Sequence, residues 1–352
     1  MIPLLFDAAT LRSFLINPWV NGLILGLMVL GVFISFRVLN IADLSVEGII
    51  PMVGMLSVVL ISLDVNPWLV LLISMAAGAL CGMINAAMMT YLKIPPLLSG
   101  IIVMALTFGI AIMINSMRSG SVNFDPNEHL TVFNWLKGLL GNISRNPVYL
   151  IYASYLSYIL VTAVILAAVW AALYFFFGTE LGMSIRAAGK NVAMAKANGI
   201  NVNLMNLIAL AISGALIGLA ASLYGQNRTM ALPTDGQGMI VIALSSLFLG
   251  EIIVGTRSFK RSLIASLVGS LVYWYIIQLL QLLDTTGFML SIYKALLLVL
   301  ILCLQMGLAK IKKKTPKRPK TSKPGDRETK ADETPSFKAS FIRHCMGERT
   351  VC

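Results

Sequence analysis

Residues that could perform catalysis are few in this chain and lie far apart. The two histidines, His129 and His344, stand outside the apolar runs, and the sequence has no HExxH, no GxSxG in a helical context and no phosphate-binding loop. Cys345 follows His344, but a metal site needs about four ligands. The sequence therefore predicts a non-catalytic chain without a bound metal or cofactor, so that any energy from ATP would come from a partner.

The stretch 178–201, GTELGMSIRAAGKNVAMAKANGIN, is the most specific signal in the sequence. It separates two apolar runs, and it is polar, basic and punctuated by alanine and glycine. This pattern predicts two short helices joined by a turn around Gly189 to Asn191. Alanine-rich faces are smooth enough to fit a groove, so we expect the segment to lie against a partner.

The polar helix start at Asn40 to Gly48, with Gln226 and Asn227 as counterparts in the second half, is the candidate for chemistry at membrane depth. The proposed lining of a solute path comprises Asn40, Asp43, Ser45, Glu47, Gln226 and Asn227. A helix that begins inside a membrane exposes backbone N–H groups and a positive dipole end, which suit a polar solute. The alternative is that Asn40 to Gly48 only caps a helix at the membrane rim. Both interpretations remain open at this stage.

Ion pairs and amide bonds explain most other polar residues in the apolar runs. Glu251 is expected to pair with Arg257 or Lys260, and Arg37 with Asp43 or Glu47. For a further set, hydrogen bonds between helices are favoured over solute contact. That set comprises Asn85, Asn115, Gln278 and Gln281.

Composition assigns the chain to the membrane. Of its 352 residues, 58% are hydrophobic and 12% are charged, and the mean hydropathy is +0.84. Soluble domains average about 45–50% apolar and about 25% charged residues, so a soluble fold of this length has too little polar surface to cover such a core. The composition predicts an all-α polytopic membrane protein.

Nine apolar segments are long enough to be membrane spans, with a count of eight to ten compatible with the pattern. They are 18–36, 48–63, 67–92, 95–117, 149–177, 204–225, 238–256, 263–283 and 290–309. Small residues recur within them, including Gly78, Gly82 and Ala86, and predict close packing between helices. Asp43 to Gly48 and Asp235 to Gly238 each place an acid before a glycine at the start of oppositely directed spans, which is the pattern of an inverted repeat.

Charge divides the chain into a membrane-spanning body, 1–309, and a basic tail, 310–352. The tail holds 13 Lys/Arg and 5 Asp/Glu, is rich in proline and is predicted to be disordered. Placing the tail in the cytoplasm by the positive-inside rule puts 178–203 in the cytoplasm and 118–148 outside. Within 118–148, the leucines between Asn127 and Gly141 predict a helix on the membrane surface.

The segment 178–201 resembles the coupling loop of bacterial ABC importer permeases of the branched-chain amino acid, ribose and nucleoside type. In that family a pattern like T-x-x-G-x-x-x-R-A-x-G-x-N, followed by A-x-x-x-G-I, docks on the ATPase. The matching residues here are Thr179, Gly182, Arg186, Ala187, Gly189, Asn191, Ala195, Gly199 and Ile200. The Glu-Ala-Ala of the wider importer signature reads Ala193-Met194-Ala195, so the glutamate is absent.

Three further stretches carry the same resemblance: 37–54, 91–106 and 236–251. They look most like the sub-branch associated with tryptophan and tyrosine. The resemblance implies the membrane-spanning subunit of an ATP-driven importer in a bacterial cytoplasmic membrane, with its C-terminus in the cytoplasm. Its implied partners are a second permease copy, a pair of ATPase subunits, an external solute-binding protein and a small organic solute, such as an amino acid, but no nucleic acid.

Two other functions compete with this interpretation. A stand-alone secondary transporter would use the same spans, but it has no need of a docking segment such as 178–201. A membrane-embedded enzyme acting on lipid would need clustered carboxylates or histidines at membrane depth, which the sequence lacks.

Overall fold

The computed structural model describes residues 8–118, 122–126, 128–135, 147–256, 258–283 and 290–314. Seven helices in these ranges are long and apolar enough to cross a membrane. Val46–Ser62 and Ile292–Leu304 are shorter apolar helices. The prediction of an all-α polytopic membrane protein with about nine helices is thereby confirmed, and the basic tail beyond residue 314 lies outside the described ranges.

The helices follow the predicted spans to within a few residues at most ends. In the first half they are α1 (Ala8–Val32), continued by the π-helix η2 (Phe33–Val38), α2 (Val46–Ser62), α3 (Pro67–Thr90), α4 (Pro96–Met117) and α6 (Pro147–Phe176). In the second half they are α7 (Glu180–Lys190), α8 (Val192–Ala197), α9 (Val202–Arg228), the 3₁₀ turn η3 (Pro233–Gly236), α10 (Met239–Val254), α11 (Phe259–Leu283) and α12 (Leu290–Lys314).

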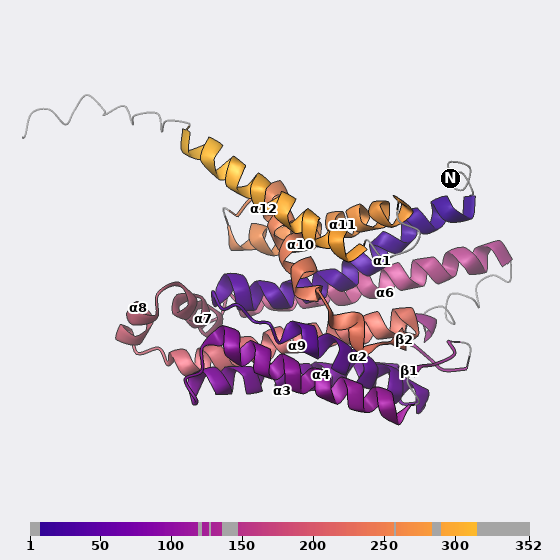
Figure 1. Cartoon of the computed structure of the whole chain (residues 1–352), viewed down its shortest axis with the longest axis horizontal. Coiled ribbons are helices and arrows are strands. Elements are labelled where there is room, and N and C mark those ends of the chain that lie inside the picture. Colours follow the sequence, from indigo (N-terminus) through magenta and orange to yellow (C-terminus); the bar gives the residue numbers. More distant parts are fainter. Residues whose placement is uncertain are drawn as a thin grey trace, which may run out of the picture. The chain divides into compact units, whose positions relative to one another are not determined.

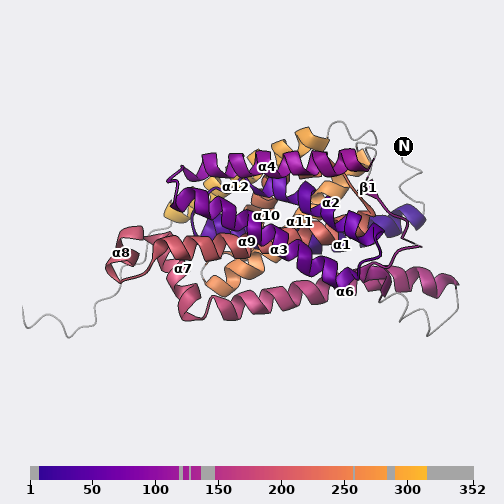
Figure 2. The same cartoon turned by 90° about the horizontal axis from the view of Figure 1, so that it is seen from below.

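The two ends of the helix bundle differ. The short helices α7 and α8 lie at one end, here named the α7–α8 end (Figure 1 and Figure 2). At the other end, here named the β end, β1 (Val122–Asn123) pairs antiparallel with β2 (Met230–Ala231), and Val122 lies opposite Ala231. This two-stranded sheet joins the segment after α4 to the segment after α9.

The predicted surface helix at 127–141 lies partly outside the described ranges, at residue 127 and at 136–141. Its described part does not lie on the surface as a whole. Val132 and Phe133 are fully buried, and the Phe133 ring stacks on Tyr158 of α6 with centroids 4.5 Å apart. Leu130 and Trp135 are exposed.

Small residues allow α3 and α9 to pack in close contact. Gly78 and Gly82 of α3 face Gly214 and Leu210 of α9 so closely that a Cβ on either α3 glycine would overlap a backbone carbonyl of α9. Ala86, one turn further, is fully buried. Close backbone approach replaces the hydrophobic driving force that helices lack inside a bilayer, so the packing role predicted for these residues is confirmed.

Two helices begin inside the bundle instead of at its ends. After η2 the chain is non-helical from Leu39 to Ser45, and α2 begins where Gly48 packs on Met104 and Thr107, midway along α4. After β2, η3 brings Gly236 against Glu47 and Pro51 of α2, and α10 starts next to that contact. From this meeting point α2 runs toward the β end and α10 toward the α7–α8 end, the opposite directions expected of the two predicted repeat elements.

Replacing Gly78 by alanine should destabilise the bundle, because the added methyl group would push α3 away from α9. Overpacking of this kind costs about 1–3 kcal/mol. The measurement is the thermal unfolding midpoint of the purified chain in detergent. Gly109→Ala in α4 is the matched control, since a Cβ there meets nothing within 4 Å, and its midpoint should not fall. Equal midpoints for both variants would contradict the packing role of Gly78.

Candidate functional site

Asp43 anchors the non-helical segment before α2. Its carboxylate is buried and accepts hydrogen bonds from the backbone N–H of Ser45 (2.9 Å) and from the side-chain amide of Asn85 in α3 (2.8 Å). The Asn85 side-chain oxygen in turn accepts from the hydroxyl of Ser99 in α4. The predicted interhelical bonding of Asn85 is confirmed. Asp43 therefore links the segment before α2 to α3 directly, and to α4 through Asn85 and Ser99.

Glu47 lies where the two internal helix beginnings meet. Its carboxylate accepts hydrogen bonds from the backbone N–H groups of Gly238 and Ile240, the first groups of α10. Gly236 packs so closely on the Glu47 carbonyl oxygen that a Cβ at that position would overlap it. The exposed N–H groups and positive dipole end of α10 thus receive a carboxylate from the protein itself. Glu47 acts as a cap supplied by another helix.

Arg37 and Glu251 form the ion pair that joins the end of α1 to the last turns of α10. The two side chains bind in a two-pronged arrangement, with nitrogen–oxygen distances of 2.8 Å for both contacts. The Glu251 side chain is only 3% exposed. The predicted pairing of Arg37 with Asp43 or Glu47 is wrong, because η2 and the last turns of α10 lie side by side and Arg37 binds Glu251 instead. Of the two partners predicted for Glu251, Lys260 places its ammonium over the Tyr174 ring, and the pairing with Arg257 stays a prediction. Arg257 itself lies outside the described residues.

The segment after α6 forms two short helices, as the sequence predicts. The Thr179 hydroxyl accepts a hydrogen bond from the N–H of Gly182 at the start of α7, and the Asn191 side chain accepts one from the N–H of Met194 at the start of α8. Asn191 is therefore both the turn and the cap of α8. Gly199 ends the segment with a φ of +76°, which glycine adopts without strain.

One face of this segment is fixed to the bundle by its glycines. A Cβ at Gly182 would overlap the backbone at Phe176 and Phe177, and one at Gly189 would overlap the Val38 carbonyl at the end of η2. Ala195 is also buried and Ile200 is half-buried. Several of the residues matched to the docking motif thus hold the segment in place on its own chain.

The opposite face of the segment is exposed and apolar. Met183 of α7 is 49% exposed, and Val192 and Met194 of α8 are 49% and 65% exposed. Ala187, Asn191 and Gly199 from the predicted set are exposed as well. Arg186 is half-buried, with its guanidinium 5.1 Å from the ring centroid of Phe259. The sequence motif identified the segment but not which of its faces is free.

A cavity of about 470 Å³ lies among α1, α9, α10 and α11 toward the β end. Asn227 lines it and donates a hydrogen bond to the side-chain oxygen of Asn21 (3.0 Å). Tyr224, Trp274, Gln278, Gln281 and Lys294 also line this cavity. Arg228 and Asp235, an ion pair at 2.8 Å, complete its polar wall. For Gln278 and Gln281 the structure adds a cavity face to the interhelical role expected from the sequence.

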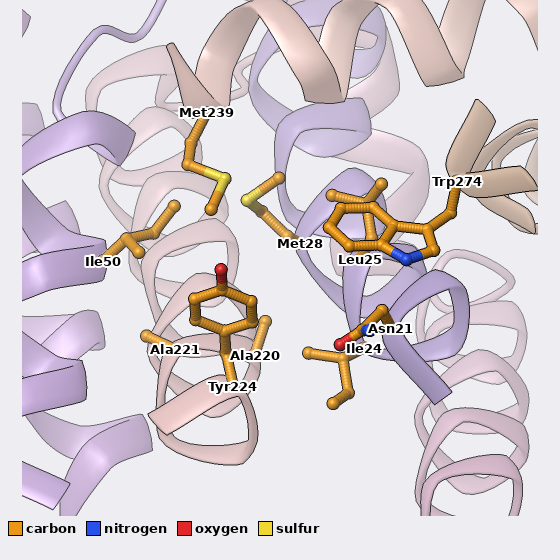
Figure 3. Close-up of a pocket in the computed structure, with 10 residues that line it drawn as sticks. All are labelled: Asn21, Ile24, Leu25, Met28, Ile50, Ala220, Ala221, Tyr224, Met239 and Trp274. Atoms are coloured by element: carbon orange, nitrogen blue, oxygen red, sulfur yellow. The ribbon is translucent and has the colours of Figure 1, made fainter. Parts of the chain in front are cut away.

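A smaller, almost wholly apolar pocket of about 30 Å³ adjoins this cavity and shares Asn21, Tyr224, Met239 and Trp274 with it. Figure 3 shows the Tyr224 ring from α9 and the Trp274 indole from α11 on opposite sides of this pocket, with the sulfur atoms of Met28 and Met239 close together along a third side. The two spaces together offer aromatic faces beside amide groups.

The six predicted pathway residues do not gather at one place. Asn40 is exposed near the α7–α8 end with a φ of +59°, while Asp43, Ser45 and Glu47 lie in the interior network. Gln226 is fully buried and bonded to the N–H of Val132 (3.2 Å) and to Ser222 (3.3 Å). Among the six, Asn227 alone is in the lining of the β-end cavity. The sequence analysis did not identify Asn21, Tyr224 and Trp274 as cavity residues. For Asn21, the position of an asparagine inside the first apolar run was an available signal.

Comparison with known proteins is consistent with this architecture. The chain matches the family described as branched-chain amino acid transport system / permease component over residues 14–305. It is 28% identical over 265 residues to the tyrosine transport system permease protein of Clostridioides difficile, covering 75% of this chain and 82% of that one. It is 24% identical over 263 residues to the ribose import permease protein RbsC of Escherichia coli K12, covering 73% and 75%.

A nucleoside-related similarity covers a shorter stretch. The chain is 31% identical over 193 residues to the guanosine ABC transporter permease protein NupQ of Bacillus subtilis, covering 53% of this chain and 57% of that one. No solved structure shows significant similarity.

Replacing Arg37 by methionine should destabilise the bundle, because the buried Glu251 carboxylate would lose its bond to the Arg37 guanidinium. Because the Arg37 side chain is 45% exposed, we expect a cost of about 1–3 kcal/mol, below that of breaking a fully buried pair. The double variant Arg37→Met/Glu251→Met removes both charges and should recover most of the loss. Thermal unfolding of the single and double variants in detergent measures the coupling. A double variant no more stable than Arg37→Met would show that the ion pair is not the link between α1 and α10.

Proposed function

Since the chain belongs to the branched-chain amino acid transport system / permease component family, we propose that it is the membrane-spanning subunit of an ATP-driven importer for a small organic solute of the amino acid class. ATP is hydrolysed in partner subunits, and this chain binds no cofactor. The protein is a multi-span protein of the bacterial inner membrane. A second copy of the chain completes the translocation path, and an external binding protein delivers the solute.

The observation that carries this proposal is the two-faced α7–α8 segment. Glycines fix its inner face to the backbone of η2 and of the end of α6, while Met183, Val192 and Met194 remain exposed on the other face. Exposed apolar side chains on a firmly seated element are typical of a protein interface. A transporter that works alone does not need such a surface, whereas the permease of an ATP-driven importer must couple to conformational changes in its ATPase subunits.

The proposed orientation places the α7–α8 end in the cytoplasm, where ATP and the ATPase subunits are. Lys190 and Lys196 lie in this segment, and Lys93 lies in the turn between α3 and α4 at the same end. The basic residues of 310–352 add to the same side by the positive-inside rule. The β end, with its cavity, then faces the solute-binding protein.

The chemistry of the β-end cavity supports an amino acid as the solute. The Arg228–Asp235 pair and Lys294 offer groups of both signs, as a zwitterion requires, and Tyr224 and Trp274 offer apolar faces. The similarity to a tyrosine transport permease points in the same direction. A pocket of mixed polarity holds its solute loosely enough to release it inward.

Reconstitution tests the proposed function. The chain is placed in proteoliposomes with the ATPase and binding protein encoded beside it, and uptake of labelled tyrosine, ribose and guanosine is compared with and without ATP. ATP-dependent uptake that requires all partners, and that is largest for the amino acid, is expected. Uptake by the chain alone would show a secondary transporter instead. ATP-dependent uptake restricted to ribose or guanosine would refute the amino acid assignment.

Replacing Met194 by glutamate should weaken binding of the ATPase, because a charge would enter an apolar contact. Truncations or disruptions at central interface residues cost about 2 kcal/mol or more, so we expect a loss of affinity of about thirtyfold. Binding of the purified ATPase to the permease in nanodiscs measures it. Met117→Glu, an equally exposed methionine at the β end (74%), should bind the ATPase like the unmodified chain. Normal affinity for Met194→Glu would refute the assigned face.

Replacing Trp274 by alanine should raise the solute concentration needed for half-maximal uptake about tenfold, because an aromatic wall of the β-end cavity is removed. The measurement is concentration-dependent uptake in the reconstituted system. Trp19→Ala is the matched control, because Trp19 is 45% exposed near the same end but does not line the cavity. If both variants shift uptake equally, the cavity has no special part in solute recognition.

A further inference from the structure

A second polar cavity, of about 460 Å³, lies at the α7–α8 end, away from the proposed solute cavity. Three elements line it: η2, α7, and the beginning of α11 with the turn before it. Its lining comprises Phe33, Arg37, Val38, Arg186, Lys190, Thr256, Ser258, Phe259 and Ser262. Three cationic groups and three hydroxyl groups therefore surround one space, a combination typical of sites for phosphate groups.

Positive charge in this cavity exceeds negative charge. Arg37 is neutralised by Glu251, but within the described part of the chain Arg186 and Lys190 form no ion pair. The Arg186 Nε atom is buried and has no hydrogen-bond partner there. Lys260, in the first turn of α11, is exposed, but its ammonium lies over the Tyr174 ring, 4.7 Å from the centroid, and it is not part of the cavity lining. Arg186, with its buried Nε–H group, and Lys190 thus remain available to an anion.

The cavity has an aromatic floor that holds Arg186 in position. Its guanidinium lies over the Phe259 ring, and that ring also contacts Phe33 and Phe177 with centroid separations of 5.9 Å and 5.0 Å. Arginine stacked on an aromatic ring keeps its N–H fork directed along the ring plane. The site is therefore held in shape before a ligand arrives.

The position of the cavity along the bundle indicates whether its anion belongs to a lipid headgroup or to a free phosphate ion. One apolar span ends at Val38 and another begins at Phe259, and both residues line the cavity. The site is thus at the level where lipid headgroups lie. Within the spans that begin or end at this level, Phe175 of α6, Ile253 of α10 and Ile264 of α11 are 72%, 53% and 40% exposed. These apolar surfaces suit acyl chains, which a free phosphate ion does not have.

We propose that this cavity binds the phosphate headgroup of an anionic phospholipid, with Arg186 and Lys190 as the main headgroup contacts. A headgroup there touches α7 and the start of α11 together, so bound lipid also holds the α7–α8 segment against the bundle. The proposal rests on the membrane location of the chain and is independent of the solute; because Arg186 also belongs to the matched docking motif, ATPase binding is measured beside lipid binding.

Native mass spectrometry of the full, delipidated chain tests the proposal. Phosphatidylglycerol and phosphatidylcholine with identical acyl chains are titrated separately, and inorganic phosphate is added as a competitor. Phosphatidylglycerol should bind about tenfold more tightly than phosphatidylcholine, and Arg186→Gln/Lys190→Gln should abolish that preference. Lys93→Gln/Lys196→Gln removes two exposed cations from the same end outside the cavity and should retain it.

A second measurement keeps the unmodified charges and so does not depend on the folding of the double variant. Ser258→Cys, in a chain whose four native cysteines are replaced, is labelled with a water-soluble thiol reagent in nanodiscs. Phosphatidylglycerol nanodiscs should slow the labelling at least threefold relative to phosphatidylcholine nanodiscs, an effect expected from a headgroup lying over that position.

Three outcomes would overturn the proposal. The first is an unchanged lipid preference in Arg186→Gln/Lys190→Gln together with equal labelling of Ser258→Cys in both lipids. The second is full displacement by millimolar inorganic phosphate, which would identify a soluble phosphate site. The third is loss of ATPase binding in the double variant without any loss of lipid binding, which would assign these cations to the protein partner.

Discussion

Two helix beginnings inside a membrane bundle impose the constraint on which the rest of this structure depends. Backbone N–H groups at such positions have no water to bond, and each one left unpaired costs several kcal/mol. Asp43 receives the N–H of Ser45 before α2, and Glu47 receives those of Gly238 and Ile240 before α10. Each helix beginning is thus satisfied by a carboxylate, and the Glu47 carboxylate belongs to the other helix, so α2 and α10 are fixed to each other.

This arrangement links the meeting point to the α7–α8 end through a short stretch of backbone. Gly189 of α7 rests on Val38 and Leu39, which lead within a few residues to Asp43. Arg37, the neighbour of Val38, binds Glu251 near the end of α10. A displacement of α7 would therefore be transmitted by direct contacts to both α2 and α10, the two helices that begin inside the bundle. The geometry provides a continuous physical connection between the proposed ATPase surface and the interior of the permease.

Sequence patterns predicted the elements that depend on local chemistry. A bilayer requires runs of about 20 apolar residues, so the seven long and two shorter apolar helices within the described ranges followed from hydropathy. Thr179 and Asn191 are short polar residues at the starts of α7 and α8, where their side chains cap the helices, so the two-helix segment was also predictable. The small residues along α3 and α9 predicted close packing, because helices in lipid associate through close backbone contacts that small residues permit.

Only the tertiary structure decided which of these residues face each other. Glu251 pairs with Arg37 across 214 positions of sequence, whereas Lys260, which is near it in sequence, places its ammonium over the Tyr174 ring. Gln226 and Asn227 are adjacent in α9, yet one is buried against Val132 and the other lines a cavity, because successive side chains on a helix point about 100° apart. Hydropathy specifies that a segment is helical and apolar, but the rotation and crossing of helices depend on contacts between distant segments. Those contacts therefore place the carboxylates of Asp43 and Glu47 at the helix beginnings and Asn227 in the lining of the cavity.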